Sequence, residues 1–257
     1  MAGAAGDTAN GAFVSPDCDA QDSAQSDVQD SAWGNASEWA VPELQKAEGF
    51  GIIPETLRDA DLTQPITRAE FAAVSVKVYE YFGPGIGIHD ASSASTPEDP
   101  AQALNPFTDT SDPEVLKAYN IGITAGTSDS TFEPDLFLNR EEAAVMLARA
   151  YKRSAFVGWT LAADADFPFP YTHHANQAPF DDDAYISDWA RDSVYFMASK
   201  GIILGMGDNL FGPRNTTPAE EEANYANATR EQALLIAARM IENLEGLPLQ
   251  GHLHMLG

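Results

Sequence analysis

The chain has 257 residues, 44% of them hydrophobic, which is enough for one domain with a sizeable core or for two small ones. Acidic residues outnumber basic ones by 39 to 14, and the formal net charge of −25 argues against nucleic acid and anionic membrane surfaces as partners. The sequence contains no run of about 18 apolar residues, so no membrane insertion is expected.

The first 32 residues hold six aspartates and no Lys or Arg, and they are rich in Ala, Gly, Ser and Gln. This composition predicts a disordered acidic arm, which we assign to residues 1–36. No signal peptide is visible, and we expect the chain to begin after one. Cys18 is the single cysteine and lies in this arm, so no internal disulfide is expected and a catalytic role is disfavoured.

One short pattern then occurs three times, and each copy precedes an amphipathic run. The copies are Thr67-Arg68-Ala69-Glu70, Asn139-Arg140-Glu141-Glu142 and Thr229-Arg230-Glu231-Gln232. A Thr or Asn followed three residues later by Glu or Gln is a capping box, which satisfies backbone amides at a helix start. Apolar residues recur after each arginine at helical spacing, broken only by Ser75. Three helices are therefore predicted to begin at these boxes.

A shorter helix is predicted before each of these three. Gly51, Gly122 and Gly201 read as the ends of preceding helices, which we expect over residues 38–48, 113–119 and 186–200. In the first and third copies a Trp-Ala pair opens the short helix, at Trp39 and Trp189. The unit is thus helix, loop, helix, and each unit is too small to bury a core alone.

The arginine in each box is unexpected, because a positive charge in the first turn opposes the helix dipole. One explanation is an ion pair with an acidic neighbour. The other is an anion-binding corner, where amides of the helix start and the guanidinium meet a carboxylate or phosphate. The sequence leaves both explanations open.

The order of these fragments resembles the S-layer homology domain. Phe-x-Asp, Trp-Ala, Gly-Ile-Ile, Phe-x-Pro and Thr-Arg-Ala-Glu follow one another as in that family, with Phe-x-Asp at Phe107 to Asp109 and Phe180 to Asp182. The resemblance implies a mainly α fold, with three helix-loop-helix repeats packed as a pseudo-threefold helical bundle. We assign the repeats to about 37–83, 105–153 and 179–245, within one unit at 37–245 that precedes a C-terminal tail at 246–257.

The resemblance also implies a function at the bacterial cell surface or cell wall. Members of the family anchor surface proteins by binding secondary cell-wall polysaccharide, often pyruvylated, in grooves between repeats. The arginine of the box contacts the acidic sugar there, with the tryptophan of Trp-Ala beside it. Carried over residue by residue, this gives the candidate ligand-binding residues Arg68, Arg140, Arg230, Trp39 and Trp189. Self-association in a surface layer is left open.

The three copies depart from the family pattern in different ways. Repeat one lacks a clear Phe-x-Asp and Phe-x-Pro, repeat two lacks the tryptophan, and repeat three carries an acidic insert at 216–227. On these grounds the grooves of Arg68 and Arg230 are ranked ahead of the groove of Arg140.

Residues 154–179 are rich in aromatic residues and proline, which favours a cap on the apolar end of the bundle over a sugar-stacking surface. No metal or cofactor is expected. His173-His174 lacks the spacing of metal ligands, and Asp181-Asp182-Asp183 lacks the Gly and Glu of a calcium loop. The aspartates read instead as a charge cluster at a helix N-terminus.

The chain is not expected to be an enzyme. It has no Gly-x-Ser-x-Gly, no phosphate-binding glycine loop and no His-Glu-x-x-His. Two alternatives to the polysaccharide anchor remain. One is a structural or protein-interaction module that has lost the glycan, which arginines buried in ion pairs would support. The other is a wall-glycan hydrolase, which would need two carboxyl groups about 5 to 9.5 Å apart in one cleft.

Overall fold

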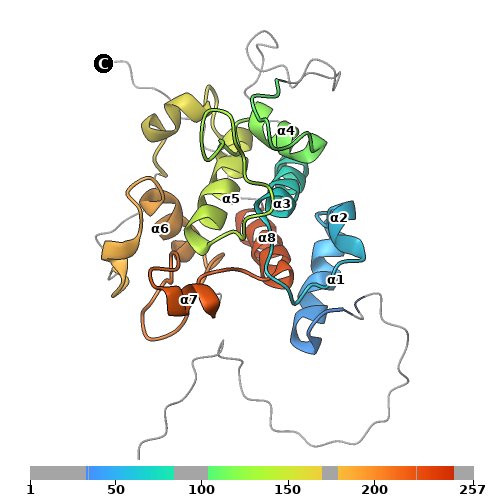
Figure 1. Ribbon diagram of the computed structural model, residues 1–257, viewed down its shortest axis with the longest axis vertical. Coiled ribbons are helices and arrows are strands. Elements are labelled where there is room, and N and C mark those ends of the chain that lie inside the picture. The colour runs from blue at the N-terminus through green and yellow to red at the C-terminus, as the bar shows by residue number, and fades with distance from the viewer. Residues whose placement is uncertain (1–32, 34, 84–103, 170–178, 224, 246–257) are drawn as a thin grey trace, which may run out of the picture.

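The computed structural model describes residues 33, 35–83, 104–169, 179–223 and 225–245, and it is mainly helical, as predicted. Figure 1 shows three long helices at the centre with shorter helices around them. The long helices are α3 (Arg68–Phe82), α5 (Arg140–Ala155) and α8 (Arg230–Leu244). The shorter helices are α1 (Val41–Gly49), α2 (Glu55–Arg58), α4 (Pro113–Asn120), α6 (Arg191–Ser199) and α7 (Pro218–Glu222), with 3-10 turns η1 (Glu38–Ala40), η3 (Leu161–Asp166) and η4 (Asp183–Tyr185).

All three predicted capping boxes are formed. The side chains of Thr67, Asn139 and Thr229 each accept a hydrogen bond from the backbone amide three residues on. The Glu or Gln at that position accepts one in return from the amide of the Thr or Asn. The long helices therefore begin at the three arginines, as the sequence predicts.

The predicted short helices are also present, with one difference. The first two occupy 38–49 and 113–120, close to their expected ranges. The third begins only at Arg191, because the residues before it form η4 and a turn. Gly51, Gly122 and Gly201 end these helices with positive φ angles of 69°, 86° and 66°, a conformation that glycine adopts without strain.

The short helix of each repeat packs on the long helix of the repeat before it. Helix α4 contacts α3, α6 contacts α5, and α1 contacts α8, so that the third repeat packs against the first. Helix α3 also contacts both α5 and α8. The repeats are therefore interlocked in a closed ring and do not form an open stack.

Three backbone hydrogen bonds close this ring at its centre. Ile66 donates to Ala228 (2.9 Å), Ala228 donates to Leu138 (3.4 Å), and Leu138 donates back to Ile66 (3.0 Å). Each of these residues lies just before a capping box, and all three side chains are buried. In the described part of the chain, the β-bridges beside these hydrogen bonds are isolated and form no sheet. The three hydrogen bonds therefore join the repeats without a sheet.

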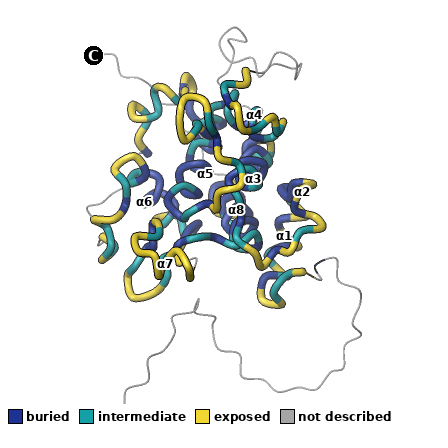
Figure 2. The backbone as a smooth tube through the Cα atoms, viewed as in Figure 1, coloured by how far each residue is buried: buried dark blue, intermediate teal, exposed yellow. Residues whose placement is uncertain are grey.

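The buried residues form one continuous apolar cluster around the long helices, which are dark blue in Figure 2. Trp33 belongs to this cluster, and the carbonyl of Asn35 accepts a hydrogen bond from Leu62. The core thus begins inside the segment 1–36 that the sequence assigns to the acidic arm. The rest of that segment up to residue 32, with Cys18, and the tail 246–257 lie outside the described residues.

Among the described helices, none has the length and apolar character needed to cross a bilayer.

The buried core should be sensitive to the loss of a single leucine side chain. Leu147 in α5 is fully buried, whereas Leu136 is 52% exposed. We expect Leu147→Ala to lower the free energy of unfolding by about 2–5 kcal/mol, because it leaves a cavity. Leu136→Ala, the matched control, should change it by less than about 0.5 kcal/mol. Urea denaturation followed by circular dichroism measures both values, and equal losses would contradict the core described above.

Candidate functional site

Each long helix starts inside the loop of the next repeat. The amides of the first two residues of α3 donate to carbonyls in the loop of repeat two, at Leu136 and Pro134. Those of α5 donate to Ala226 and Pro213, and those of α8 donate to Gln64 and Leu62. The sequence analysis left open that these amides bind an anion. In the structure they donate to loop carbonyls, so any anion site here must depend on side chains.

The Phe-x-Asp aspartates hold these loops in place. Asp109 accepts hydrogen bonds from the amides of Phe132 (3.0 Å) and Glu133 (2.7 Å), which lower its pKa. Asp182 binds the amides of Phe211 (2.9 Å) and Gly212 (2.7 Å) in the same way. Sequence reasoning missed this role, because the aspartates and the amides lie far apart in the chain.

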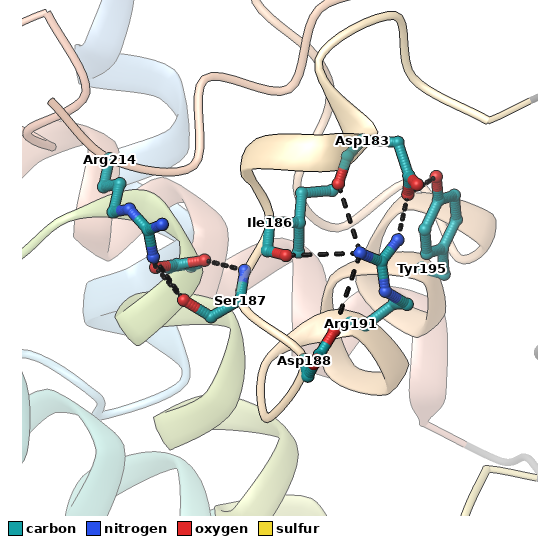
Figure 3. Close-up of polar contacts among 8 residues, drawn as sticks. Asp183, Ile186, Ser187, Asp188, Arg191, Tyr195 and Arg214 are labelled. Atoms are coloured by element: carbon teal, nitrogen blue, oxygen red, sulfur yellow. Dashed lines mark hydrogen bonds and ion pairs between the residues drawn. The ribbon is translucent and has the colours of Figure 1, made fainter. Parts of the chain in front are cut away.

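The aspartates Asp181-Asp182-Asp183 lie at the start of the short turn η4 and not at the start of α6, and each has its own partner. Asp182 holds the loop, and Asp181 accepts a hydrogen bond from Asn209. Asp183 pairs with Arg191 and accepts a hydrogen bond from the hydroxyl of Tyr195 at 2.7 Å (Figure 3). Burial, together with this hydrogen bond, raises the pKa of Tyr195 to about 12.

Arg68 is buried in an ion pair with the second repeat. Its Nη1 lies 2.7 Å from Oε1 of Glu142, the glutamate of the next capping box. Its Nε donates to the carbonyl of Phe132 at 3.1 Å, and the guanidinium lies over the Phe132 ring, 5.0 Å from its centroid. All of these contacts are internal.

Arg230 is engaged in a similar way with the first repeat. Its Nη2 lies 2.7 Å from Oε1 of Glu70, again the glutamate of the next capping box. Its Nε lies 3.0 Å from the same oxygen, and Nη1 donates to the carbonyl of Asp61. These two arginines match the ion-pair explanation that the sequence left open.

Arg140 differs from both. It is as buried as Arg68, at 7% exposure, and its guanidinium lies over the ring of Phe211. Its Nε and Nη2 donate to the carbonyls of Phe211 and Leu204. Among the described residues, however, no carboxylate forms an ion pair with it. Burial lowers the pKa of Arg140 to about 10 against the opposing effects of Asp182 and Tyr225, so it stays charged at neutral pH.

The sequence already contains the reason for this difference. The carboxylates that pair with Arg68 and Arg230 come from the last residue of the next box in the ring. By the same order, the residue that corresponds to them at Arg140 is Gln232, which carries no charge. This signal could have been found from the three boxes alone once their order in the ring is known.

The segments that carry the two tryptophans are hydrogen-bonded to the preceding repeat. The side chain of Glu141, next to Arg140, accepts hydrogen bonds from the amide and hydroxyl of Ser187, two residues before Trp189. Arg214 pairs with Glu141 at 3.0 Å and also donates to the hydroxyl of Ser187, as Figure 3 shows.

Glu231, next to Arg230, binds Ser37 in the same way, two residues before Trp39. The chain just before each tryptophan is thus bound to the glutamate that follows the box arginine of the preceding repeat. Both side chains are about half exposed, at 56% and 49%.

The described part of the aromatic segment packs inward, as expected for a cap. Phe156, Trp159 and Phe169 are buried, and Phe169 stacks on Phe196 of α6 with ring centroids 3.6 Å apart. Residues 170–178, with His173 and His174, lie outside the described residues. Over the described ranges, no group of three or more His, Cys, Asp or Glu side chains could hold a metal ion.

Asp164 fixes this cap to helix α5. It pairs with the buried Lys152 at 2.9 Å and with Arg149 at 3.0 Å, and it accepts a hydrogen bond from Nε1 of Trp159 at 3.0 Å. Burial alone would raise the pKa of Asp164, but the hydrogen bond and charge of Lys152, with the bonds from Trp159 and Arg149, lower it below its ordinary value.

The fold and these interfaces define a helical repeat module whose copies interlock through their loops. Residues 106–144 and 179–217 match the family model of the S-layer homology domain, and the first repeat is not matched. Two of the three repeats are therefore similar to the S-layer homology domain.

Two longer enzymes share part of this sequence. An endoglucanase of Bacillus sp. (strain KSM-635) is 26% identical over 189 residues, which are 72% of this chain and 17% of the endoglucanase. An amylopullulanase of Thermoanaerobacterium thermosulfurigenes is 29% identical over 125 residues, which are 49% of this chain and 5% of the amylopullulanase. The chain therefore spans less than a fifth of the length of either relative.

Removal of the Asp164 charge should loosen the cap in a pH-dependent way. We expect Asp164→Asn to lower the free energy of unfolding at pH 7 by about 1–3 kcal/mol, because Lys152 loses its closest carboxylate. The lowered pKa means that this stabilisation is present above about pH 4 and is lost as the pH falls below it. Wild type and variant should therefore converge near about pH 2.

The matched control is Asp166→Asn, which changes an exposed aspartate in the same turn. Chemical denaturation between pH 2 and 7 measures all three proteins. A loss of stability at Asp164→Asn that stays constant with pH would contradict the assignment of the effect to the ionised carboxylate.

Proposed function

We propose that this chain is a non-catalytic anchor that binds an acidic cell-wall polysaccharide at the interface between repeats two and three. The match of two repeats to the S-layer homology domain supports association with the cell surface or cell wall. The observation that carries the finer proposal is Arg140, a buried cation that makes no ion pair with any described residue.

A guanidinium in this state is suited to a ligand carboxylate. Two of its nitrogens donate to carbonyls, while Nη1 has no hydrogen-bond partner among the described residues. Charge-assisted hydrogen bonds to arginine are about twice as strong as neutral ones, and a partly desolvated site strengthens them further. A carboxylate on a sugar would supply the charge that the protein does not.

The surroundings of Arg140 suit a sugar ring. Tyr225 and Leu204 lie close to the guanidinium and are 38% and 47% exposed, and Ser187, two residues before Trp189, binds the neighbouring Glu141. Aromatic rings commonly pack on the apolar faces of their partners while their edges stay in water. A pyruvylated sugar, which joins one carboxylate to an apolar ring face, is the ligand we favour.

The high negative charge of the chain does not prevent this binding. Repulsion between exposed charges is screened beyond about 10 Å at 0.1 M salt. Contacts at the interface then decide affinity, and the acidic surface selects against densely charged polymers.

The alternative of a purely structural module accounts for two of the three interfaces. Arg68 and Arg230 are held in internal ion pairs, as that alternative requires. It does not account for Arg140, because a buried charge without an ion pair lowers the stability of the fold. The remote alternative of a wall-glycan hydrolase draws on the names of the two relatives, yet the shared part is a small fraction of each.

Loss of Arg140 should weaken polysaccharide binding and leave the fold intact. We expect Arg140→Ala to weaken binding of purified wall polymer about tenfold to a hundredfold, because a charge-assisted contact is lost. Arg140→Lys should recover only part of this, because lysine keeps the charge but lacks the planar fork. Co-sedimentation with native and de-pyruvylated polymer measures binding, and circular dichroism checks the fold.

Arg58→Ala is the matched control, because Arg58 is a half-exposed arginine whose removal causes the same change in charge. It should bind the polymer as wild type does. Equal binding by Arg140→Ala and wild type, or equal binding to native and de-pyruvylated polymer, would refute the proposed site.

A further inference from the structure

Each long helix carries a second cation, nine residues after the arginine of its capping box. These cations are Lys77 on α3, Arg149 on α5 and Arg239 on α8 (77−68, 149−140, 239−230). Lys77 pairs with a glutamate of its own helix at 3.0 Å, and Arg149 pairs at 3.0 Å with Asp164 of the cap, residues 156–169. Arg239 is partly exposed, and no described residue forms an ion pair or a hydrogen bond with it.

On α5, the cap covers the helix surface around this cation. Asp164 holds Arg149. The carbonyl of Trp159 accepts a hydrogen bond from Arg153, one helical turn further along α5. The Trp159 ring also covers Gly122, just beyond the end of α4, since a methyl group on Gly122 would lie 3.4 Å from the ring. The cap therefore supplies an aspartate to the cation and an aromatic ring to the glycine.

No described residue covers the corresponding surface of α8. Asn243 takes the position of Arg153, and its side chain donates to the carbonyl of Lys200 at 2.8 Å, so this face of α8 points toward the end of α6. Arg239 lies on the same face, one turn before Asn243. A methyl group on Gly201, just beyond α6, would meet only the amide nitrogen of Asn243 in the described part of the chain, at 3.7 Å. The cation and the glycine thus both lack the contacts that the cap provides on α5.

We propose that the acidic N-terminal arm, residues 1–32, binds this surface of α8, with an aspartate on Arg239 and an aromatic ring at Gly201. The surface is separate from the interface of Arg140, so the inference does not depend on the proposed function. The bound arm joins the third repeat to the first, much as the cap joins the end of α4 to α5 and α6.

The composition of the arm suits this surface. Its 32 residues hold six aspartates and no Lys or Arg, and hydrogen bonds between a guanidinium and a carboxylate are among the strong ones in proteins. Phe13 is the one aromatic residue of the arm, four residues before Asp17 and six before Asp19 (17−13, 19−13). In the cap, five residues separate Trp159 from Asp164 (164−159). The arm therefore offers the same two groups as the cap, at a similar spacing.

The arm also joins the core close to this surface. Trp33 is buried, and the amide of Ser37 donates to Glu231 of α8 at 2.9 Å. Arg239 lies eight residues further along α8 (239−231), which is about 12 Å at the rise of an α-helix. Twenty residues separate Phe13 from Trp33 (33−13), and they can span up to about 70 Å. The arm therefore reaches Arg239 easily and acts there at an effective concentration of about millimolar.

The single cysteine, Cys18, lies in the arm and provides the direct test. A nitroxide spin label on Cys18 of the full ¹⁵N-labelled chain broadens the NMR resonances of nearby amides. We expect the amide signals of Arg239 and Gly201 to fall at least about twofold relative to the reduced label, because the arm is bound for half of the time or more when its affinity is about millimolar. The signal of Gly122, which the cap covers, should not change. Unchanged signals at Arg239 and Gly201 would overturn the inference.

Removal of the cation should release the arm. In the spin-labelled Arg239→Gln variant we expect the Gly201 signal to recover, because the aspartates lose their partner. Arg58→Gln is the matched control, because Arg58 is a half-exposed arginine of α2 whose removal causes the same change in charge. It should show the same loss of signal as the wild type. Equal loss in Arg239→Gln and the wild type would contradict the inference, and circular dichroism checks the fold of both variants.

Changes in the arm test the other side of the contact without altering the core. The double variant Asp17→Asn with Asp19→Asn should restore the α8 signals, and so should Phe13→Ala. The control is Asp27→Asn with Asp30→Asn, which removes the same charge elsewhere in the arm and should leave the loss of signal in place. The same result for both double variants would refute the proposed role of these two aspartates.

A mixture of two chains shows whether the arm binds its own chain. Unlabelled chain with the nitroxide on Cys18 is mixed with ¹⁵N-labelled Cys18→Ser, which carries no spin label. The signal of Arg239 should not change in this mixture. A loss of this signal would assign the bound arm to a second copy and would overturn binding within one chain.

Discussion

The structure depends on a three-membered ring of backbone hydrogen bonds between Ile66, Ala228 and Leu138. The ring brings together three chain segments that each lead into a capping box, so the three long helices start from one centre. Because each start inserts into the loop of the next repeat, the helix amides and the loop carbonyls satisfy one another. The number of residues from this centre then determines where the arginines, the Phe-x-Asp aspartates and the short helices lie.

The sequence predicts the local features of this arrangement and misses the contacts between repeats. Capping boxes, glycine stops and apolar spacing depend on a few neighbouring residues, and the helices at 68–82, 140–155 and 230–244 follow from them. The delayed start of α6 at Arg191 does not, because the residues before it form η4 and a turn. The hydrogen bonds of Ser37 and Ser187 to the preceding repeat do not follow from local pattern either, because their partners Glu231 and Glu141 lie far away in the chain.

The two explanations offered for the arginines both describe part of this molecule. Arg68 and Arg230 have the acidic neighbours that one explanation requires, and the other is our proposal for Arg140. The hydrogen bonds of all three to loop carbonyls offset part of the cost of a cation at a helix start. What separates them is electrostatic compensation by a residue of the neighbouring repeat, which no inspection of a single repeat could reveal.

The closed ring also fixes how many repeats the module can contain. An open stack of repeats can gain or lose a copy at its ends, because each copy contacts only its neighbours. Here the loop around Leu62 and Gln64 receives helix α8, and α1 packs on the same helix, so the last copy occupies the place that a fourth would need. Duplication of one copy would have to break this closure. The number of repeats, three, is therefore set by the geometry of the unit. Substitutions can change the individual interfaces but not this number.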